Sequence, residues 1–258
     1  MAKKTTGSAS ARRAKIEATR KNARGGPDRI IVGAVVAVVA IIAVVGGVVV
    51  AAQDKQERAG TSTSVPAAAE AMGEGYVANK DVALAPGAPT LEIYEDFQCP
   101  ACAQFERVMG ATVAELAEQG KIRLVYHFKT IIDANTGTTH SLTMGNAAMC
   151  AAEAGAGAFQ SFHDDVFAHL PAQEGQGWTA AQTTGFAEKA GITGAALDTW
   201  QSCVDDRRYN AYIESTEEAS ARADITGTPT IVLAGERLDL DQIGDVQGLT
   251  AAIEAATP

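Results

Sequence analysis

Two cysteines separated by two residues, Cys99 and Cys102, are the side chains of this sequence best suited to chemistry. They lie where a predicted strand over 90–97 gives way to a predicted helix over 100–118. A cysteine thiolate attacks disulfides, and a second thiol one helical turn away is near enough to attack the mixed disulfide that results. The spacing therefore indicates thiol–disulfide exchange, in which Cys99 meets the substrate and Cys102 resolves the intermediate.

The start of the predicted helix gives an electrostatic reason for reactivity at Cys99. Pro100 suits the first helical position, because its missing N–H would have no partner there. Cys99 then lies at or beside the N-cap, where unpaired backbone N–H groups and the positive end of the helix dipole favour a negative sulfur. We expect the pKa of Cys99 to lie below that of a free cysteine.

Two other interpretations of the pair remain open. A Cys-x-x-Cys motif can form half of a zinc site, but zinc would need a second Cys or His pair at ligand spacing, and Cys150 and Cys203 are isolated. A purely structural bridge between Cys99 and Cys102 would close so short a loop that it would stabilise the chain little. We therefore predict no metal site.

The chain after about residue 76 alternates strands and helices, which is typical of an α/β domain. A βαβ unit spans the first part of it and ends in an apolar strand over 122–132. A stretch over about 138–221, rich in Ala and Glu and poor in strand-forming runs, predicts several helices separated by Gly or Pro turns. The domain closes with two predicted strands and a helix, over 230–233, 237–240 and 243–256.

A second motif lies just before the first of these late strands, in the run ITGTPTI over 225–231. Proline at a strand start removes one ladder donor, and an X-Pro bond in a tight turn is where a cis peptide occurs. CPAC at a strand-to-helix junction, together with GTPT before a late strand, resembles the thioredoxin superfamily. The run YEDFQCPAC over 94–102 resembles the DsbA family, in its membrane-anchored actinobacterial form, and the resemblance covers about residues 76–257.

The resemblance implies an α/β, thioredoxin-like fold with a helical insertion. It also implies that Cys99 is the exposed nucleophile, Cys102 its buried partner, and Pro229 a cis-proline facing the pair. No cofactor is implied. The residues expected to contact a bound substrate are Thr228, Pro100 and Ala101.

The segment before the domain predicts a single N-terminal transmembrane helix. Residues 1–29 carry nine Lys or Arg against Glu17 and Asp28, although the whole chain has a net charge of -10. The uncharged apolar run over 30–52 is about 34 Å long as a helix, enough to cross a hydrocarbon core of about 30 Å. Because a cationic flank tends to stay cytoplasmic, we expect a single-pass cell-membrane protein with its catalytic domain, 76–258, outside the cytoplasm.

An alternative to this anchor is a cleaved signal peptide, since the apolar run ends in small residues, although it is longer than the usual signal core. Residues 53–75, rich in Ala, Ser, Thr and charge, predict a flexible linker. The basic tail is explained by its position next to the predicted membrane helix, where it sets the orientation of that helix. We therefore expect no nucleic-acid partner. A composition of 47% hydrophobic and 20% charged residues excludes a chain that is disordered throughout.

In an oxidising compartment Cys150 and Cys203 can form a disulfide within the helical stretch, and two buried free thiols are the alternative. Glu95, on the strand before the motif, can modulate the Cys99 thiol or transfer a proton, or can be a plain solvated carboxylate. No histidine has a convincing partner in the sequence. We interpret all four as ordinary surface or core residues: His127, His140, His163 and His169.

These patterns favour an extracytoplasmic enzyme that passes its Cys99–Cys102 disulfide to reduced exported proteins. The resemblance implies reoxidation by a membrane partner that is similar to vitamin K epoxide reductase or to DsbB. Residues 1–75 offer no dimerisation domain, so we expect a monomer. A disulfide isomerase or reductase of the same fold is the alternative, as is a non-catalytic binding or chaperone module.

Overall fold

The computed structural model describes residues 62–257. The predicted basic tail over 1–29 and the predicted membrane span over 30–52 lie outside the described residues. Within the described range, no helix is both long enough and apolar enough to cross a membrane.

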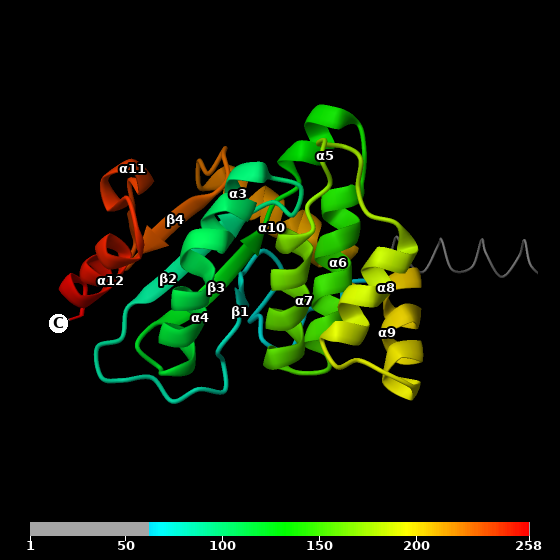
Figure 1. Ribbon diagram of the computed structural model, residues 1–258, viewed down its shortest axis with the longest axis horizontal. Helices are drawn as coiled ribbons and strands as arrows, with labels where there is room; N and C mark the ends of the chain where they lie inside the picture. The colour runs from blue at the N-terminus through cyan, green and yellow to red at the C-terminus, as the bar shows by residue number, and fades with distance from the viewer. Residues whose placement is uncertain (1–61, 258) are drawn as a thin grey trace, which may run out of the picture. The chain divides into compact units, whose positions relative to one another are not determined.

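One mixed sheet of five strands, in the order β1-β3-β2-β4-β5, forms the centre of the domain (Figure 1). The central strand β2 pairs in parallel with β3 and antiparallel with β4. Half-buried and fully buried side chains alternate from Thr90 to Ile93, as a pleated strand requires, and the last two residues, Tyr94 and Glu95, are both buried. The strands are β1 (Tyr76–Val77), β2 (Thr90–Glu95), β3 (Arg123–Phe128), β4 (Thr230–Leu233) and β5 (Glu236–Arg237).

A continuous helical segment follows β2, as predicted for 100–118, but it has three parts. These are α3 (Pro100–Phe105), a π-helical turn η1 (Glu106–Gly110) and α4 (Ala111–Glu118). The π turn was not predicted, and such turns occur frequently at functional sites. Gly110 at its end lacks a Cβ that would collide with the carboxylate of Glu106, so this turn can hold that side chain close to the helix.

The predicted helical insertion over about 138–221 is present and lies beside the sheet (Figure 1). A disulfide between Cys150 and Cys203 joins two of its helices, with 5.9 Å between the Cα atoms, so these cysteines are paired and are not free thiols. The helices are α6 (His140–Ala152), α7 (Ala156–Ala168), α8 (Ala180–Lys189), α9 (Ala195–Asp205) and α10 (Asn210–Arg222).

Three predicted strands were too long. The strand predicted over 90–97 ends at Glu95. The strand predicted over 122–132 ends at Phe128, and a short helix α5 (Ile131–Thr136) follows because Asp96, distant in sequence, accepts a hydrogen bond from the backbone N–H of Ile132. The strand predicted over 237–240 ends at Arg237. Asp239 caps a further helix α11 (Leu240–Ile243), which separates it from the closing helix α12 (Val246–Ala255).

The predicted linker over 53–75 is wrong for its described part, residues 62–75, because these residues pack against the domain. Pro66 is buried, and the backbone N–H of Gly73 donates to Ser215 of α10 at 2.8 Å. The hydroxyl of Tyr212, also in α10, donates to the backbone oxygen of Glu74 at 2.8 Å. The folded part therefore begins earlier than predicted.

Candidate active site

The cysteine pair lies at the junction of β2 and α3, as the sequence predicts. Cys99 is the N-cap residue of α3, and its Sγ accepts a hydrogen bond from the backbone N–H of Cys102 at 3.4 Å. Pro100 is the first residue of the helix. The sulfur of Cys99 therefore occupies the place that a hydroxyl or carboxylate oxygen takes at other helix starts, and both cysteines are in the dithiol form.

Cys102 is buried, as the resemblance implied, but Cys99 is less accessible than it implied. Cys99 is 6% exposed and Cys102 is 1% exposed, so the predicted nucleophile is almost covered. Pro100 and Ala101, between them, are exposed.

The two thiols differ strongly in acidity. Hydrogen bonding with Cys102 lowers the pKa of Cys99 to about 6 and outweighs the opposing effect of burial; the Thr228 side chain and nearby backbone N–H groups lower it further. Burial raises the pKa of Cys102 well above its ordinary value, and hydrogen bonding with Cys99 and the negative charges of Cys99 and Glu95 add to this effect. Near neutral pH, Cys99 is therefore a thiolate beside a protonated Cys102.

The predicted cis peptide bond is present between Thr228 and Pro229, and the loop that contains it faces the pair. Sγ of Cys99 lies 3.5 Å from the backbone oxygen of Thr228, to which it donates a hydrogen bond when it is protonated, and both loop residues are half-buried. Lys129, which is 1% exposed, holds the start of this loop by donating to the backbone oxygen of Ile225 at 2.9 Å.

Sequence reasoning missed a buried polar network directly behind Cys99. The amide nitrogen of Gln98 donates to Asp133 at 2.8 Å and to the hydroxyl of Ser141 at 2.7 Å. Its amide oxygen accepts from the backbone N–H of Gly175 at 2.9 Å. All of these partners belong to the helical insertion or its approach, so the insertion fixes the residue that precedes the nucleophile.

Asp96 belongs to the same network. Its carboxylate accepts from the hydroxyl of Ser141 at 2.6 Å and from the backbone N–H groups of Gln98 and Ile132. Burial raises the pKa of Asp96 to about 6, although these hydrogen bonds oppose the shift. No pattern in the sequence revealed the contacts with Ile132 and Ser141, because these two partners lie 36 and 45 positions further along the chain.

The interpretation of His163 as an ordinary residue without a partner was wrong. Its Nε2 lies 2.7 Å from Oε1 of Glu95, and the two side chains are 0% and 1% exposed. Glu95 is therefore not a solvated carboxylate. Its negative charge raises the pKa of Cys102, so its influence falls on the resolving cysteine.

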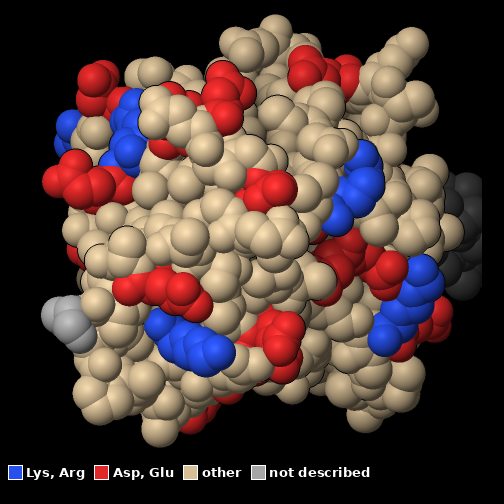
Figure 2. All heavy atoms as spheres, turned by 60° about the vertical axis from the view of Figure 1, so that its left-hand side comes forward, with Lys and Arg blue, Asp and Glu red and all other residues tan. Residues whose placement is uncertain are grey.

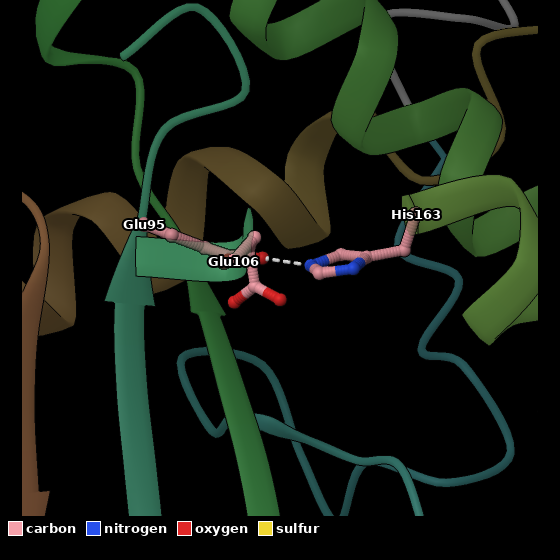
Figure 3. Close-up of side chains that lie close together, drawn as sticks. All are labelled: Glu95, Glu106 and His163. Atoms are coloured by element: carbon pink, nitrogen blue, oxygen red, sulfur yellow. Dashed lines mark hydrogen bonds and ion pairs between the residues drawn. The ribbon is translucent and has the colours of Figure 1, made fainter. Parts of the chain in front are cut away.

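Glu106, which sequence reasoning did not single out, completes this buried cluster (Figure 3). Burial raises its pKa to about 8, with help from Glu95 and Asp164 and against the effect of His163. Burial lowers the pKa of His163, but the neighbouring carboxylates, Glu95 foremost, raise it well above the ordinary value.

Among the described residues, Glu95, Glu106 and His163 are a set whose donor atoms lie within 4.8 Å of one another. Two donors on one tetrahedral zinc ion, each about 2.1 Å from it, would be about 3.4 Å apart. The Glu95 and His163 donors are 2.7 Å apart, which is a hydrogen-bond distance. We therefore interpret the cluster as a hydrogen-bonded group that holds protons.

A family model described as thioredoxin matches residues 85–255, which include the cysteine pair, the insertion and the cis-proline loop. The chain belongs to the thioredoxin family. Within this family the domain carries the inserted helices α6 to α10 between β3 and β4, which is the arrangement that the sequence predicted.

Solved structures that are similar to this domain include DsbA from Mycobacterium tuberculosis in its reduced form. That structure is 29% identical, with a TM-score of 0.51, and the match covers 68% of this chain and 95% of that one. DsbG from the same organism is 29% identical, with a TM-score of 0.52, over 69% of this chain and 90% of that one. MdbA from Actinomyces oris shares the fold, with 24% identity and a TM-score of 0.57, over 67% of this chain and 83% of that one.

Curated sequences with a matching stretch include two sodium/proton antiporters. NhaA 1 of Salinispora arenicola is 26% identical over 167 residues, and NhaA 3 of Salinispora tropica is 27% identical over 167 residues. The match spans 65% of this chain but only 23% of each antiporter. The likeness thus concerns a minor part of those proteins.

Proposed function

We propose that this thiol–disulfide oxidoreductase introduces disulfides into exported proteins. The supporting observation is the acidity difference between its two thiols, with the pKa of Cys99 near 6 and that of Cys102 well above its ordinary value. A stabilised Cys99 thiolate favours the reduced form of the enzyme, and this makes its disulfide a stronger oxidant. The solved relative DsbG is named a disulfide bond oxidoreductase, and both DsbG and DsbA match over most of their length.

The reaction begins when a substrate thiolate attacks Sγ of Cys99. The bond between Cys99 and Cys102 breaks, and its electron pair leaves on the sulfur of Cys102. A second substrate thiolate then attacks the mixed disulfide, so the substrate gains a disulfide and Cys99 leaves as a stabilised thiolate.

The backbone oxygen of Thr228, beside Cys99, supports recognition of an extended substrate through its main chain. The face in Figure 2 shows acidic and basic side chains interspersed, with wide areas that carry neither.

The cellular setting follows from the sequence. We propose that the apolar run over 30–52 anchors the protein, that the basic tail stays in the cytoplasm, and that the catalytic domain acts outside as a monomer. A membrane partner similar to vitamin K epoxide reductase or DsbB would then reoxidise the Cys99–Cys102 dithiol.

The redox equilibrium of the full chain with glutathione tests the direction of the reaction. An oxidase has a disulfide that glutathione reduces readily, and it speeds the oxidative refolding of a reduced protein. A disulfide that persists in excess reduced glutathione would contradict the proposal and favour a reductase. Unchanged refolding rates with Cys99→Ser would instead indicate a binding module.

A further inference from the structure

Lys129 is a buried lysine that takes no part in the exchange steps described above. It follows the last residue of β3, and its side chain is 1% exposed. Its Nζ donates to Oε1 of Glu217, in α10, at 3.0 Å and to the backbone oxygen of Ile225 at 2.9 Å. One ammonium group therefore joins the end of β3, helix α10 and the start of the loop that carries Thr228 and Pro229.

The carboxylate that pairs with this ammonium is itself fixed to the end of β3. Oε2 of Glu217 accepts a hydrogen bond from the backbone N–H of Thr130 at 2.8 Å. The hydroxyl of Thr216, the preceding residue of α10, donates to the backbone oxygen of Phe128 at 2.8 Å. The sheet and α10 together therefore set the position of Nζ of Lys129.

The loop over 225–229 starts at a point that Lys129 fixes. The chain leaves α10 through Asp224, whose φ of 58° reverses its direction. Ile225 is then buried, and its backbone N–H donates to the backbone oxygen of Ser220 at 3.0 Å. Its carbonyl accepts from Nζ of Lys129. Because both backbone groups of Ile225 are bonded, the direction in which the loop leaves the helix is set there.

The middle of the loop has few other supports. Among the described residues, the backbone N–H groups over 226–228 donate to no other backbone group, and the first two of these residues are exposed. The hydroxyl of Thr230 adds one bond, to the backbone oxygen of Gly227 at 2.9 Å. The place of the Thr228 carbonyl, 3.5 Å from Sγ of Cys99, therefore depends on where the loop starts.

Filling the space of the Lys129 side chain does not require an ammonium group. A methionine has a similar size and avoids the loss of hydration that a buried charge suffers. It cannot supply the hydrogen bond to the carbonyl of Ile225, and such a bond from a charged donor is stronger than one from a neutral donor. The bond to the loop is therefore what distinguishes lysine from an apolar residue at this position.

We propose that Lys129 is a positioning residue for disulfide exchange, which holds the Thr228–Pro229 loop where the main chain of an extended substrate can pair with it while a substrate sulfur reaches Cys99. The inference rests on the exchange proposed above. Lys129 acts through the loop, so its loss should weaken the use of a peptide substrate. A small dithiol has no main chain to pair with the loop and should depend on Lys129 much less.

The test compares two reductants of the oxidised full chain. One is a reduced peptide with two cysteines, and the other is dithiothreitol. The initial rate at which the Cys99–Cys102 disulfide opens is measured against the concentration of each reductant for the wild type, Lys129→Met and Lys121→Met. Lys121 is an exposed lysine beyond the end of α4, so its variant is the matched control.

We expect Lys129→Met to raise the KM for the peptide, so that the rate at low peptide concentration falls about tenfold more than the rate with dithiothreitol, as the loss of one good hydrogen bond would cause. Lys121→Met should match the wild type with both reductants. A general loss of structure would slow both reactions alike. The ratio of the two rates therefore separates positioning of the loop from a merely structural role.

Equal losses with the peptide and with dithiothreitol, or no loss with either, would overturn the inference and leave the proposed function intact. If Lys129→Met fails to fold, Glu217→Gln decides. It removes the negative charge that holds Lys129, and it should also slow the peptide more than dithiothreitol, whereas an unchanged ratio would overturn the inference. A wild-type chain that leaves the peptide reduced would overturn the proposed function, and the inference with it.

Discussion

The backbone N–H of Cys102 donates a hydrogen bond to Sγ of Cys99 across 3.4 Å, so the second cysteine of the pair helps to stabilise the charge of the first. The Cys102 side chain acts in the same direction and is the largest cause of the low pKa of Cys99. The resolving residue is thus also part of the environment that makes the nucleophile reactive. Its backbone contribution survives substitution of the side chain, whereas its thiol contribution does not.

Cys102→Ala should therefore raise the pKa of Cys99 from about 6, because the alanine side chain offers no donor to the thiolate. Cys102→Ser keeps a hydroxyl donor and should raise it less. The rate of alkylation of Cys99 by iodoacetamide as a function of pH gives both values. Identical profiles for the two variants and the wild type would show that the Cys102 side chain has no such role.

The stability of the reduced protein should depend on pH through Cys99. Its pKa falls from 9.0 to about 6 in the folded state, so the charged thiol stabilises the fold fully above pH 9, and this contribution is lost as the pH falls toward 6. Urea unfolding of the reduced wild type and of Cys99→Ser between pH 5.5 and pH 9 isolates the effect, since other groups cancel. The free energy of unfolding of the wild type should increase relative to that of Cys99→Ser as the pH rises. A difference that stays constant with pH would contradict the low pKa of Cys99.

Gln98→Ala should destabilise the domain by about 1–3 kcal/mol, because it leaves the buried Asp133 and Ser141 without the donor that joins them. Gln173→Ala is the matched control, since that side chain is exposed. Chemical denaturation of the oxidised proteins measures both free energies of unfolding. If the free energy of unfolding falls equally in the two variants, the network behind Cys99 does not hold the insertion to the catalytic motif.

Removal of the insertion disulfide should cost about 4 kcal/mol in the chain-entropy treatment, because Cys150 and Cys203 are 53 positions apart. The double variant Cys150→Ala/Cys203→Ala tests this in thermal and urea unfolding. The low pKa of Cys99 makes its thiolate a good leaving group, so mild reductant should open the Cys99–Cys102 disulfide before the Cys150–Cys203 disulfide. Alkylation of Cys150 before Cys99 under graded reduction would contradict that order.

The features that the sequence predicted are those with local causes. Cys99 at a strand-to-helix junction, Pro100 at the first helical position, and the Gly or Pro turns between the inserted helices all follow from neighbouring residues. The missed features depend on distant partners. Asp96 starts α5 where apolar residues predicted a strand, and Gln98 binds a loop 77 positions away.

His163 shows most clearly that contacts between distant residues could not be predicted from the sequence. Its partner Glu95 lies 68 positions earlier, and only the packing of α7 against the end of β2 brings the two together. Glu106 gave no signal either, because a helical glutamate is ordinary in sequence. Glu106 begins the π turn, and its carboxylate lies against Gly110, where a Cβ would collide with it.

The ionisation of Cys99 in the reduced full chain is the most direct test of the mechanism. Ultraviolet absorbance of the thiolate, followed from pH 3 to pH 10 with Cys99→Ser as the reference, should show one transition with a pKa of about 6, while Cys102 remains protonated. A Cys99 transition no lower than that of free cysteine, at about 8.5, would contradict the account.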